Sequence, residues 1–438
     1  MSSEFMIKKL QDVIEFVIDN RGRNPKSYQT NGIPVIDNYL ITNEGKVNLD
    51  NVKRFIDEET YNTFLRKYIE KDDVLMTLVG NGYGQVAITP NEQCAIIQNT
   101  IGLRCNNLNF NKFLYYLLSN NRESLMNLNR GAAQPSIKVG DILELEFNFP
   151  PLPTQKKIAH ILSTLDDKIE LNRKMNQTLE SVASAIFKSW FVDFDPVHAK
   201  ANCESEVELE NIAKELGISK EILDLFPSEF EESELGMIPK GWEVYKIIDK
   251  LEVLLGGTPS RSNESYWTNG TVAWINSGKV NEFRIIEASE LITEEAVKKS
   301  STKLLPKKTT VLAITGATLG QVSLLEINSC ANQSVIGLPQ TEELNHSFVY
   351  PCICNAIKDL ISHQTGGAQQ HINKGNVENY QIVIPSSEIL KKYVSLAKPL
   401  LEQISNLCFE NKALEKTRDT LLPKLLSGEI DVLELEIK

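Results

Sequence analysis

Seven apolar residues and two asparagines recur at alternating spacings of four and three residues between positions 158 and 186. The positions are Ile158, Leu162, Leu165, Ile169, Asn172, Asn176, Leu179, Ala183 and Ile186. This heptad pattern predicts a long helix packed against a partner helix. Prolines at 150, 151 and 153 stop the preceding structure, because proline lacks an amide donor and forces its predecessor into extended geometry. We expect a helix of about 34 residues, roughly 50 Å long, with Thr154 as its N-terminal cap.

A second heptad pattern lies near the end of the chain. Its positions are Tyr393, Ala397, Leu400, Ile404, Leu407, Asn411, Leu414, Arg418, Leu421 and Leu425. Buried asparagine lowers the stability of a coiled coil but fixes its register and partner. We therefore predict that the two helices pair and that Asn172, Asn176 and Asn411 set their register. Pro399 should kink the second helix or mark its start. An ordinary amphipathic helix in a bundle would explain either heptad run alone.

The chain contains two copies of one unit, about 235 residues apart. The matches pair GNGYGQV (80–86) with GATLGQV (316–322), IGL (101–103) with IGL (336–338), and GAAQPSI (131–137) with GGAQQHI (366–372). The glycines of the first match predict tight turns in a sheet, because the second copy keeps only Gly316 and Gly320. Each unit is therefore a globular domain followed by a long helix.

Short β-rich segments and helical segments alternate within each globular domain. The β-rich segments are 74–78, 86–88, 143–147, 311–314, 322–325 and 382–384, and the helical segments are 110–119 and 347–360. This mixture predicts an α+β fold with a twisted, mostly antiparallel sheet.

The net charge of −12 at first argues against nucleic-acid binding. Most of it comes from one segment, because residues 204–234 carry eleven acidic and two basic side chains. The remainder can therefore present basic faces. We expect the acidic segment to be a solvated connector with a short helix near 212–225. Seven cysteines without paired spacing, no run of 18 apolar residues and no signal peptide predict a cytoplasmic protein.

Polar residues in loops are the candidate DNA-binding groups. The repeated motifs at 131–138 and 366–374 place small residues before Gln, Ser or His and a Lys. Glycine lets a backbone approach closely, glutamine can pair with adenine, and lysine can contact phosphate. A turn with a capping role explains a single copy equally well, but repetition favours binding. Weaker candidates lie at 21–26 and 257–260, where the second segment is near Tyr266, Trp267 and Trp274. The full set is Arg21, Arg23, Lys26, Gln134, Ser136, Lys138, Thr258, Ser260, Lys279, Gln369, Gln370, His371 and Lys374.

The sequence contains no motif that predicts catalysis. It lacks G-x-x-x-x-G-K-[ST], and its five histidines are scattered rather than grouped as metal ligands or bases. Asp166-Asp167-Lys168 resembles part of a nuclease motif but lies within the heptad pattern. We expect a non-catalytic chain without a metal or cofactor of its own.

Several longer runs resemble the specificity subunit of type I restriction-modification systems. They are PPLPTQKKIAHILSTLDDKIELNRKMNQTLE, AIFKSWFVDFDPV, FEESELGMIPKGWEV, YWTNGTVAWI and LLPKLLSGEI. The resemblance covers essentially the whole chain in the order of that family. It implies target-recognition domains at 1–150 and 239–385, conserved helices at 151–197 and 386–438, and an acidic linker at 198–238.

The resemblance also implies a function for each part. Each target-recognition domain would read one half of a bipartite double-stranded DNA site, and the helices would pair antiparallel and set the half-site spacing. Because the two domains have diverged, the site should be asymmetric. Two methylation subunits would dock on the helical regions, which we assign to Trp190, Phe191, Asp193, Lys424 and Leu425, and restriction subunits would join them. S-adenosylmethionine, ATP and Mg²⁺ are expected on those partner subunits.

The alternative is a coiled-coil adaptor whose globular domains bind protein rather than DNA. A gel shift with and without a methyltransferase partner distinguishes the two, because an adaptor would show no sequence preference in either case. A stand-alone methyltransferase or nuclease would need cofactor or metal motifs that this sequence does not display.

Overall fold

A computed structural model describes residues 5–42, 44–80, 82–130, 135–203, 205–362 and 371–432. The chain divides into two compact units. Unit 1 comprises Met1–Ile169 and Ala413–Lys438, and unit 2 comprises Glu170–Lys412. Each unit therefore contains one globular domain and a section of both long helices.

The two long helices are α6 (Leu152–Phe191, 40 residues) and α14 (Ser387–Ser427, 41 residues). Helix α6 begins two residues before Thr154, which lies in its first turn, so the prediction that Thr154 caps the helix is wrong. The second helical position tolerates Pro153, because the first amides of a helix have no intrahelical acceptor. Helix α14 runs through the exposed Pro399, so this proline does not mark its start.

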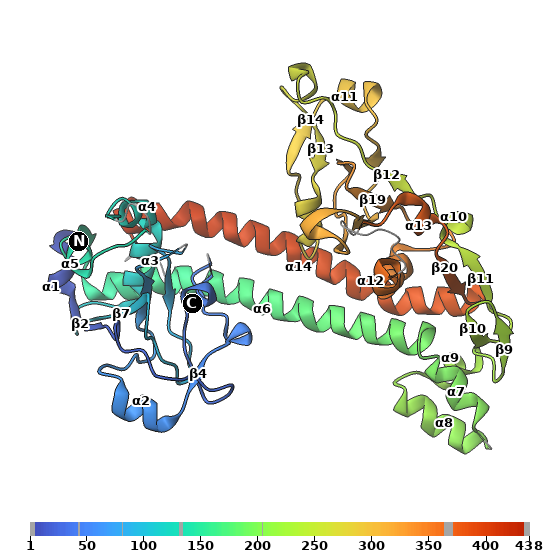
Figure 1. Ribbon diagram of the computed structural model, residues 1–438, viewed down its shortest axis with the longest axis horizontal. Helices are drawn as coiled ribbons and strands as arrows, with labels where there is room; N and C mark the ends of the chain where they lie inside the picture. The colour runs from blue at the N-terminus through green and yellow to red at the C-terminus, as the bar shows by residue number, and fades with distance from the viewer. Residues whose placement is uncertain are drawn as a thin grey trace. The chain divides into compact units, whose positions relative to one another are not determined.

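Within unit 2, α6 and α14 run antiparallel, as predicted (Figure 1). The Asn172 Nδ2 group donates to Asn411 Oδ1 over 2.9 Å, and Asn176 Nδ2 donates to Cys408 Sγ over 3.5 Å. All three asparagines are buried, and apolar contacts of the helix pair follow Asn172 and Asn176 along α6. Their role in setting the register stays a prediction.

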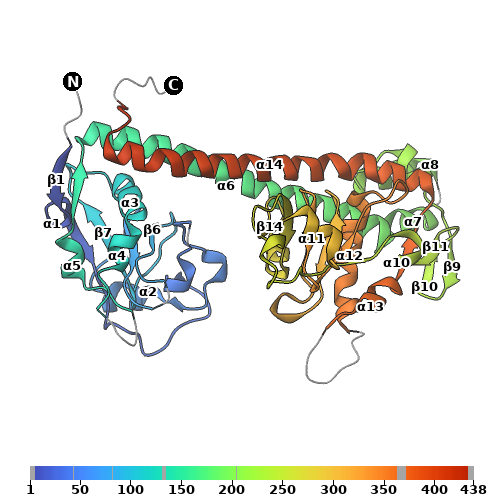
Figure 2. The ribbon, with the colours of Figure 1, turned by 90° about the horizontal axis from the view of Figure 1, so that it is seen from above.

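The globular part of unit 1 is built on a four-stranded antiparallel sheet with the order β2-β7-β5-β6. Helix α3 lies against this sheet (Figure 2). Its Phe113 and Leu117 share a core with Ile158 and Leu162 of α6, so the domain is fixed to the helix by apolar packing. The elements are β1 (Met6–Lys9), α1 (Leu10–Val13), β2 (Ile14–Ile18), β3 (Ile33–Pro34), η1 (Asn38–Leu40), η2 (Leu49–Asn51), β4 (Phe55–Ile56), α2 (Glu58–Phe64), β5 (Val74–Thr77), β6 (Val86–Ile88), β7 (Thr100–Cys105), α3 (Asn111–Asn120), α4 (Arg122–Met126), α5 (Val139–Leu143) and β8 (Glu146–Phe149).

The globular part of unit 2 contains two four-stranded sheets. Their orders are β12-β19-β16-β17 and β14-β13-β18-β15, and the pairing of β13 with β18 is parallel whereas the others are antiparallel. The mostly antiparallel α+β prediction is confirmed. The elements are β11 (Glu243–Lys246), α10 (Ile247–Lys250), β12 (Leu254–Leu255), η3 (Glu264–Tyr266), β13 (Val272–Ile275), η4 (Ser277–Asn281), β14 (Glu290–Ile292), α11 (Glu294–Lys299), β15 (Leu304–Leu305), β16 (Thr310–Ala313), η5 (Gly316–Thr318), β17 (Val322–Leu324), β18 (Ser329–Ala331), β19 (Val335–Leu338), α12 (His346–Ser362), α13 (Lys374–Glu378) and β20 (Gln381–Ile384).

Each globular domain pairs its first strand with its last. Strand β1 pairs antiparallel with β8, and β11 pairs antiparallel with β20. The chain therefore enters and leaves each domain next to the start of a long helix. One predicted strand is displaced: Leu143 ends α5, and the strand begins only at Glu146.

The acidic segment contains a short helix within 212–225, as predicted, but it is more extensively folded than the predicted solvated connector. It forms α7 (Asp195–Ala201), α8 (Glu206–Glu215), α9 (Lys220–Asp224) and a hairpin of β9 (Phe230–Ser233) and β10 (Gly236–Pro239). Ile222, Leu223 and Phe226 are buried in the core of unit 2, and the Phe226 ring centroid lies 5.1 Å from that of Trp190. The high density of acidic residues concealed this apolar face. No helix in the described residues is both long and apolar enough to span a membrane.

Candidate nucleic-acid interface

The glycine motif of unit 1 forms a tight turn between β5 and β6. The Gly84 amide donates to Thr77 O over 2.8 Å, and the Thr77 amide donates to Gln85 O over 2.9 Å. Gly80 and Gly84 have φ angles of +94° and +76°. Residues other than glycine rarely adopt these φ angles, so the turn requires glycine.

The same turn recurs in unit 2 between β16 and β17. The Gly320 amide donates to Ala313 O, and the Ala313 amide donates to Gln321 O, both over 2.9 Å. Gly316 and Gly320 have φ angles of +71° and +82°. This confirms the interpretation of the glycine motif as a tight turn in a sheet.

In each unit a second loop, which contains Ile137 or Ile372, is hydrogen-bonded to this turn. In unit 1 the Ile137 amide donates to Leu78 O over 3.0 Å and the Gly80 amide donates to Pro135 O over 3.2 Å. In unit 2 the Ile372 amide donates to Ile314 O over 3.0 Å. The repeated motifs that the sequence singled out therefore meet in space in both units.

A third segment completes the site. The Leu78 amide donates to Asn99 O over 2.7 Å, and the Ile314 amide donates to Ser334 O over 2.9 Å. Gln98 and Gln333 directly precede these acceptors. We call the three converging segments of each unit the three-loop site. Gln98 and Gln333 were missed in the sequence analysis, although QNTIGL (98–103) and QSVIGL (333–338) align in the repeat.

In unit 1 the predicted residues fall into two groups. Ser136 lies in the three-loop site, where its amide donates to Asn129 Oδ1 over 2.9 Å, and the exposed Lys138 precedes α5. Arg21, Arg23 and Lys26 lie in the loop between β2 and β3. Arg21 forms an ion pair with Asp19 at 2.7 Å, the Arg23 guanidinium lies 5.7 Å from the Phe64 ring centroid, and Lys26 is exposed.

The buried Asn20 ties this β2–β3 loop to the three-loop site. Its Nδ2 group donates to Ile96 O over 3.1 Å, two residues before Gln98.

In unit 2 the predicted residues are more dispersed. The Thr258 hydroxyl donates to Gln333 Oε1 over 2.6 Å, which places it at the three-loop site. His371 directly precedes Ile372 and is exposed. Ser260 shares a hydrogen bond with Ser262 at 2.9 Å. Lys279 and Lys374 form ion pairs with Glu282 at 2.7 Å and Glu378 at 3.2 Å, so their charges are already compensated.

Gln134, Gln369 and Gln370 lie outside the described residues. Their proposed contacts with DNA bases stay predictions. Among the described residues, no group of three or more His, Cys, Asp or Glu side chains is placed to hold a metal ion.

Three of the five residues assigned to partner docking require correction, and the assignment of the partly exposed Asp193 and Lys424 stays a prediction. The side chains of Trp190, Phe191 and Leu425 are 2%, 8% and 1% exposed, respectively, and belong to the apolar cores of their units. A partner cannot contact them without opening those cores. Asp193 forms an ion pair with Lys188, and Lys424 forms one with Glu429 at 3.0 Å.

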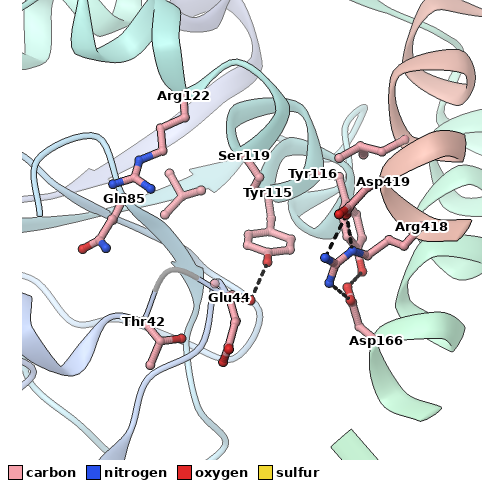
Figure 3. A pocket seen from close by; sticks show the side chains of 13 residues that line it. Thr42, Glu44, Gln85, Tyr115, Tyr116, Ser119, Arg122, Asp166, Arg418 and Asp419 are labelled. Carbon is pink, nitrogen blue, oxygen red and sulfur yellow. Dashed lines mark hydrogen bonds and ion pairs between the residues drawn. The ribbon is translucent and has the colours of Figure 1, made fainter. Parts of the chain in front are cut away.

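A cavity of about 190 Å³ lies in unit 1 between α3, α6 and α14 (Figure 3). The Tyr116 hydroxyl donates to Asp166 Oδ2 over 2.6 Å, and the Arg418 guanidinium donates to Asp166 Oδ1 over 2.8 Å. Burial, with the nearby Asp166 carboxylate, raises the pKa of Tyr115 to about 12 and raises that of Tyr116 further. Although burial opposes it, hydrogen bonding to Asp166 raises the pKa of Arg418. These charges compensate one another, so the group braces α3 against both helices.

Comparisons with known proteins agree with this architecture. The family described as the type I restriction modification DNA specificity domain matches residues 2–181 and 239–416. The HindI type I restriction enzyme specificity subunit of Haemophilus influenzae is 30% identical over 406 residues, which cover 83% of this chain and 88% of that protein. The MjaIX specificity subunit of Methanocaldococcus jannaschii is 28% identical, covering 98% and 94%.

A solved structure supports the fold independently. The S subunit of a type I restriction-modification system from M. genitalium superposes with a TM-score of 0.60 at 16% identity, covering 97% of this chain and 96% of that one. The two family matches together include both globular domains and most of both long helices. The chain therefore belongs to the family of type I restriction modification DNA specificity domains and carries two copies of that domain.

Proposed function

We propose that this chain is the DNA sequence-specificity subunit of a type I restriction-modification complex. The observation that carries the proposal is the three-loop site, which the two family domains build with the same backbone hydrogen bonds at Leu78 and Ile314. Exposed polar loops on a fixed scaffold are suited to reading base edges. The protein-binding adaptor is disfavoured, because the matched family and the two relatives are described by DNA specificity or as specificity subunits.

Each domain would read a different half of a bipartite DNA site. The backbones of the two three-loop sites are alike, but Ser136 stands where unit 2 has His371. The β2–β3 loop of unit 1 carries three basic residues, whereas the corresponding segment of unit 2 has Thr258, Ser260 and the single basic residue Arg261. The two sites thus present different hydrogen-bonding side chains on similar loop backbones, which favours an asymmetric DNA target.

The length of the helix pair would set the spacing of the half-sites. Deleting residues 170–176 together with 408–414 removes one heptad from each helix and keeps the heptad phase. The helices shorten by about 10 Å, so the unspecific gap in the target should shorten by about three base pairs. The measurement is the methylation pattern left by the reconstituted complex on a DNA library. An unchanged gap in a folded complex would contradict this role.

Catalysis would belong to the partner subunits. We infer that two methylation subunits and the restriction subunits bring S-adenosylmethionine, ATP and Mg²⁺, and that the complex acts in the cytoplasm. A methyl-transfer assay should therefore show activity for the assembled complex and none for this chain alone. Transfer by the isolated chain would contradict the assignment.

The exposed side of α6 is the surface that we assign to a methylation subunit in place of the buried aromatics. Leu171, Met175 and Val182 are 55%, 41% and 44% exposed and follow helical spacing along α6. Replacing Leu171 and Met175 with serine should weaken co-purification with that subunit, whereas Lys174→Ser, between them in sequence, should not. Equal recovery of both variants would remove this surface from consideration.

A further inference from the structure

Arg261 of unit 2 is held on an aromatic surface. Its guanidinium carbon lies 3.6 Å from the Trp267 ring centroid and 5.1 Å from that of Trp274. Glu290 accepts two hydrogen bonds of 2.7 Å from the two terminal nitrogens. The Trp267 indole in turn donates to Ser260 O over 3.1 Å. The guanidinium is thus fixed in plane and position while its side chain remains 52% exposed.

Arg54 of unit 1 has similar surroundings, although its side chain is only 25% exposed. Its guanidinium carbon lies 4.5 Å from the Tyr28 ring centroid. Asp37 accepts from Nε over 2.8 Å and from a terminal nitrogen. That same nitrogen donates to Gln98 Oε1 over 3.2 Å.

The two clusters occupy the same place in the fold. Tyr28 precedes β3 by five residues, and Trp267 precedes β13 by five. Strand β3 pairs with β4 as β13 pairs with β14, with Pro34 opposite Phe55 and Ala273 opposite Leu291. Arg54 therefore stands at the strand position of Glu290. Arg54 and Arg261 come from different positions of the repeat. Each nevertheless lies on the aromatic ring at the equivalent position, Tyr28 or Trp267, and forms a bidentate pair with a carboxylate.

Both clusters adjoin the three-loop site. Gln98 contacts Arg54 directly, and Gln333, its counterpart in the repeat, accepts from Thr258 three residues before Arg261. The Arg261 and Glu290 side chains are 52% and 43% exposed, and an exposed ion pair contributes little to stability. Stability therefore does not explain the cluster of unit 2, although the Arg54–Asp37 pair of unit 1 is more buried.

The hydrogen-bond donors of a stacked arginine match the acceptors of guanine. A guanidinium has five N–H donors in a plane. Glu290 occupies two donors of Arg261. Asp37 and Gln98 together occupy three donors of Arg54, so Arg54 can form a second in-plane bidentate pair only when Gln98 releases the terminal nitrogen that it shares with Asp37. Arginine pairs bidentately with O6 and N7 of guanine in the major groove. Stacking on an aromatic ring reduces the entropy lost when that plane is presented to a base.

We propose that Arg261 reads a guanine in the half-site of the second domain and that Arg54 reads a guanine in the half-site of the first. The proposal rests on the proposed function and deepens it, since it names one base for each domain. Glu290 and Asp37 act as positioning residues that hold the guanidinium planes.

The test uses the complex reconstituted with its methylation subunits and a library of target variants. Arg261→Lys keeps the charge but removes the planar fork. We expect binding to the target to weaken roughly ten- to a hundredfold, with discrimination lost at one guanine of one half-site only. Arg54→Lys should have the corresponding effect in the other half-site. Replacing that guanine by 7-deazaguanine, which lacks the N7 acceptor, should weaken binding by the unmodified complex more than binding by the lysine variant.

The controls separate this proposal from the proposed function. Lys298→Met removes an exposed charge of α11, outside the cluster, and should leave every base preference unchanged. The half-site read by the unmutated domain reports whether the complex is assembled, and the remaining base preferences in the half-site of the mutated domain report whether that domain is folded. Full discrimination by either lysine variant overturns the assignment for that domain and leaves the proposed function intact. A parent complex without any sequence preference overturns both.

Discussion

The two units fix their globular domains to the long helices with similar groups from different parts of the chain. In unit 1, Tyr116 of α3 binds Asp166 of α6, which pairs with Arg418 of α14. In unit 2, Arg284 lies between its partners: it donates to Glu180 of α6 over 2.6 Å and to the Tyr350 hydroxyl of α12 over 3.2 Å. Unit 1 thus takes both charges from the helices, whereas unit 2 takes its cation from the domain.

The two arginines also differ in burial, and burial determines how much each ion pair matters for stability. The Arg284 side chain is fully buried, whereas that of Arg418 is 25% exposed. Charge burial is costly unless the partner remains, so removing one member of a buried pair destabilises more than removing one member of a solvated pair. We therefore expect unit 2 to depend more strongly on its ion pair.

Arg284→Met should have the largest effect. It leaves Glu180 without its buried cation and should lower the free energy of unfolding of unit 2 by about 3–5 kcal/mol. All four tryptophans, Trp190, Trp242, Trp267 and Trp274, lie in unit 2, so urea unfolding followed by tryptophan fluorescence reports this unit.

Lys299→Met is the matched control, because Lys299 pairs with Glu295 on the exposed face of α11. Its effect should be small, because the ion pair is exposed to solvent. Equal losses in the two variants would contradict the importance of burial. A smaller loss for Arg284→Met than for Arg418→Met, measured by hydrogen exchange in unit 1, would reverse the comparison.

A pH response should also distinguish the units. Helix α12 begins at the buried His346, and α3 begins at Asn111, which accepts from the Cys105 amide over 2.8 Å and carries no charge at any pH. His346 shares a 2.8 Å hydrogen bond with Gln340. Burial, with Lys308, Lys398 and Arg284 nearby, lowers the pKa of His346 to about 3.

The pKa of His346 is lower in the folded chain than in the unfolded chain, so stability should fall as the pH falls. The unfolded chain binds a proton near pH 6.5, but the folded chain does so only near pH 3, so stability is present above pH 6.5 and is lost as the pH falls below it. Between pH 8 and pH 5 this histidine should cost unit 2 about 2 kcal/mol. Unfolding of the parent and of His346→Asn at both pH values isolates the effect. Identical pH dependence would show that His346 takes up its proton in the folded state.

The sequence predicted those features that depend on local periodicity or on repetition. Heptad spacing located both helices, and the two copies of the glycine motif identified the sheet turns. It did not predict the aromatic-stacked arginines, because Arg54 and Arg261 do not align in the repeat and meet their partners only through the fold. Trp190 and Phe191 were assigned to the surface because the core that covers them includes Phe226, from a segment whose charge concealed its apolar face.

The last comparison concerns two tyrosines, whose replacement should have effects similar to or smaller than that of His346. Tyr116→Phe removes a 2.6 Å hydrogen bond to a carboxylate, and Tyr350→Phe removes a 3.2 Å bond accepted from Arg284. Hydrogen bonds to charged groups contribute about 1.5–3 kcal/mol, and the shorter one should lie within that range. Tyr350→Phe should cost less, about 1 kcal/mol, because Arg284 keeps the stronger contact with Glu180.

Hydrogen exchange of α3 and α12 measures the two losses in one experiment. A larger loss in α12 would mean that the Tyr350 hydroxyl, rather than the Glu180 carboxylate, is the main support of the buried Arg284. Unit 2 would then resemble unit 1, in which a tyrosine hydroxyl joins the domain to the helix pair.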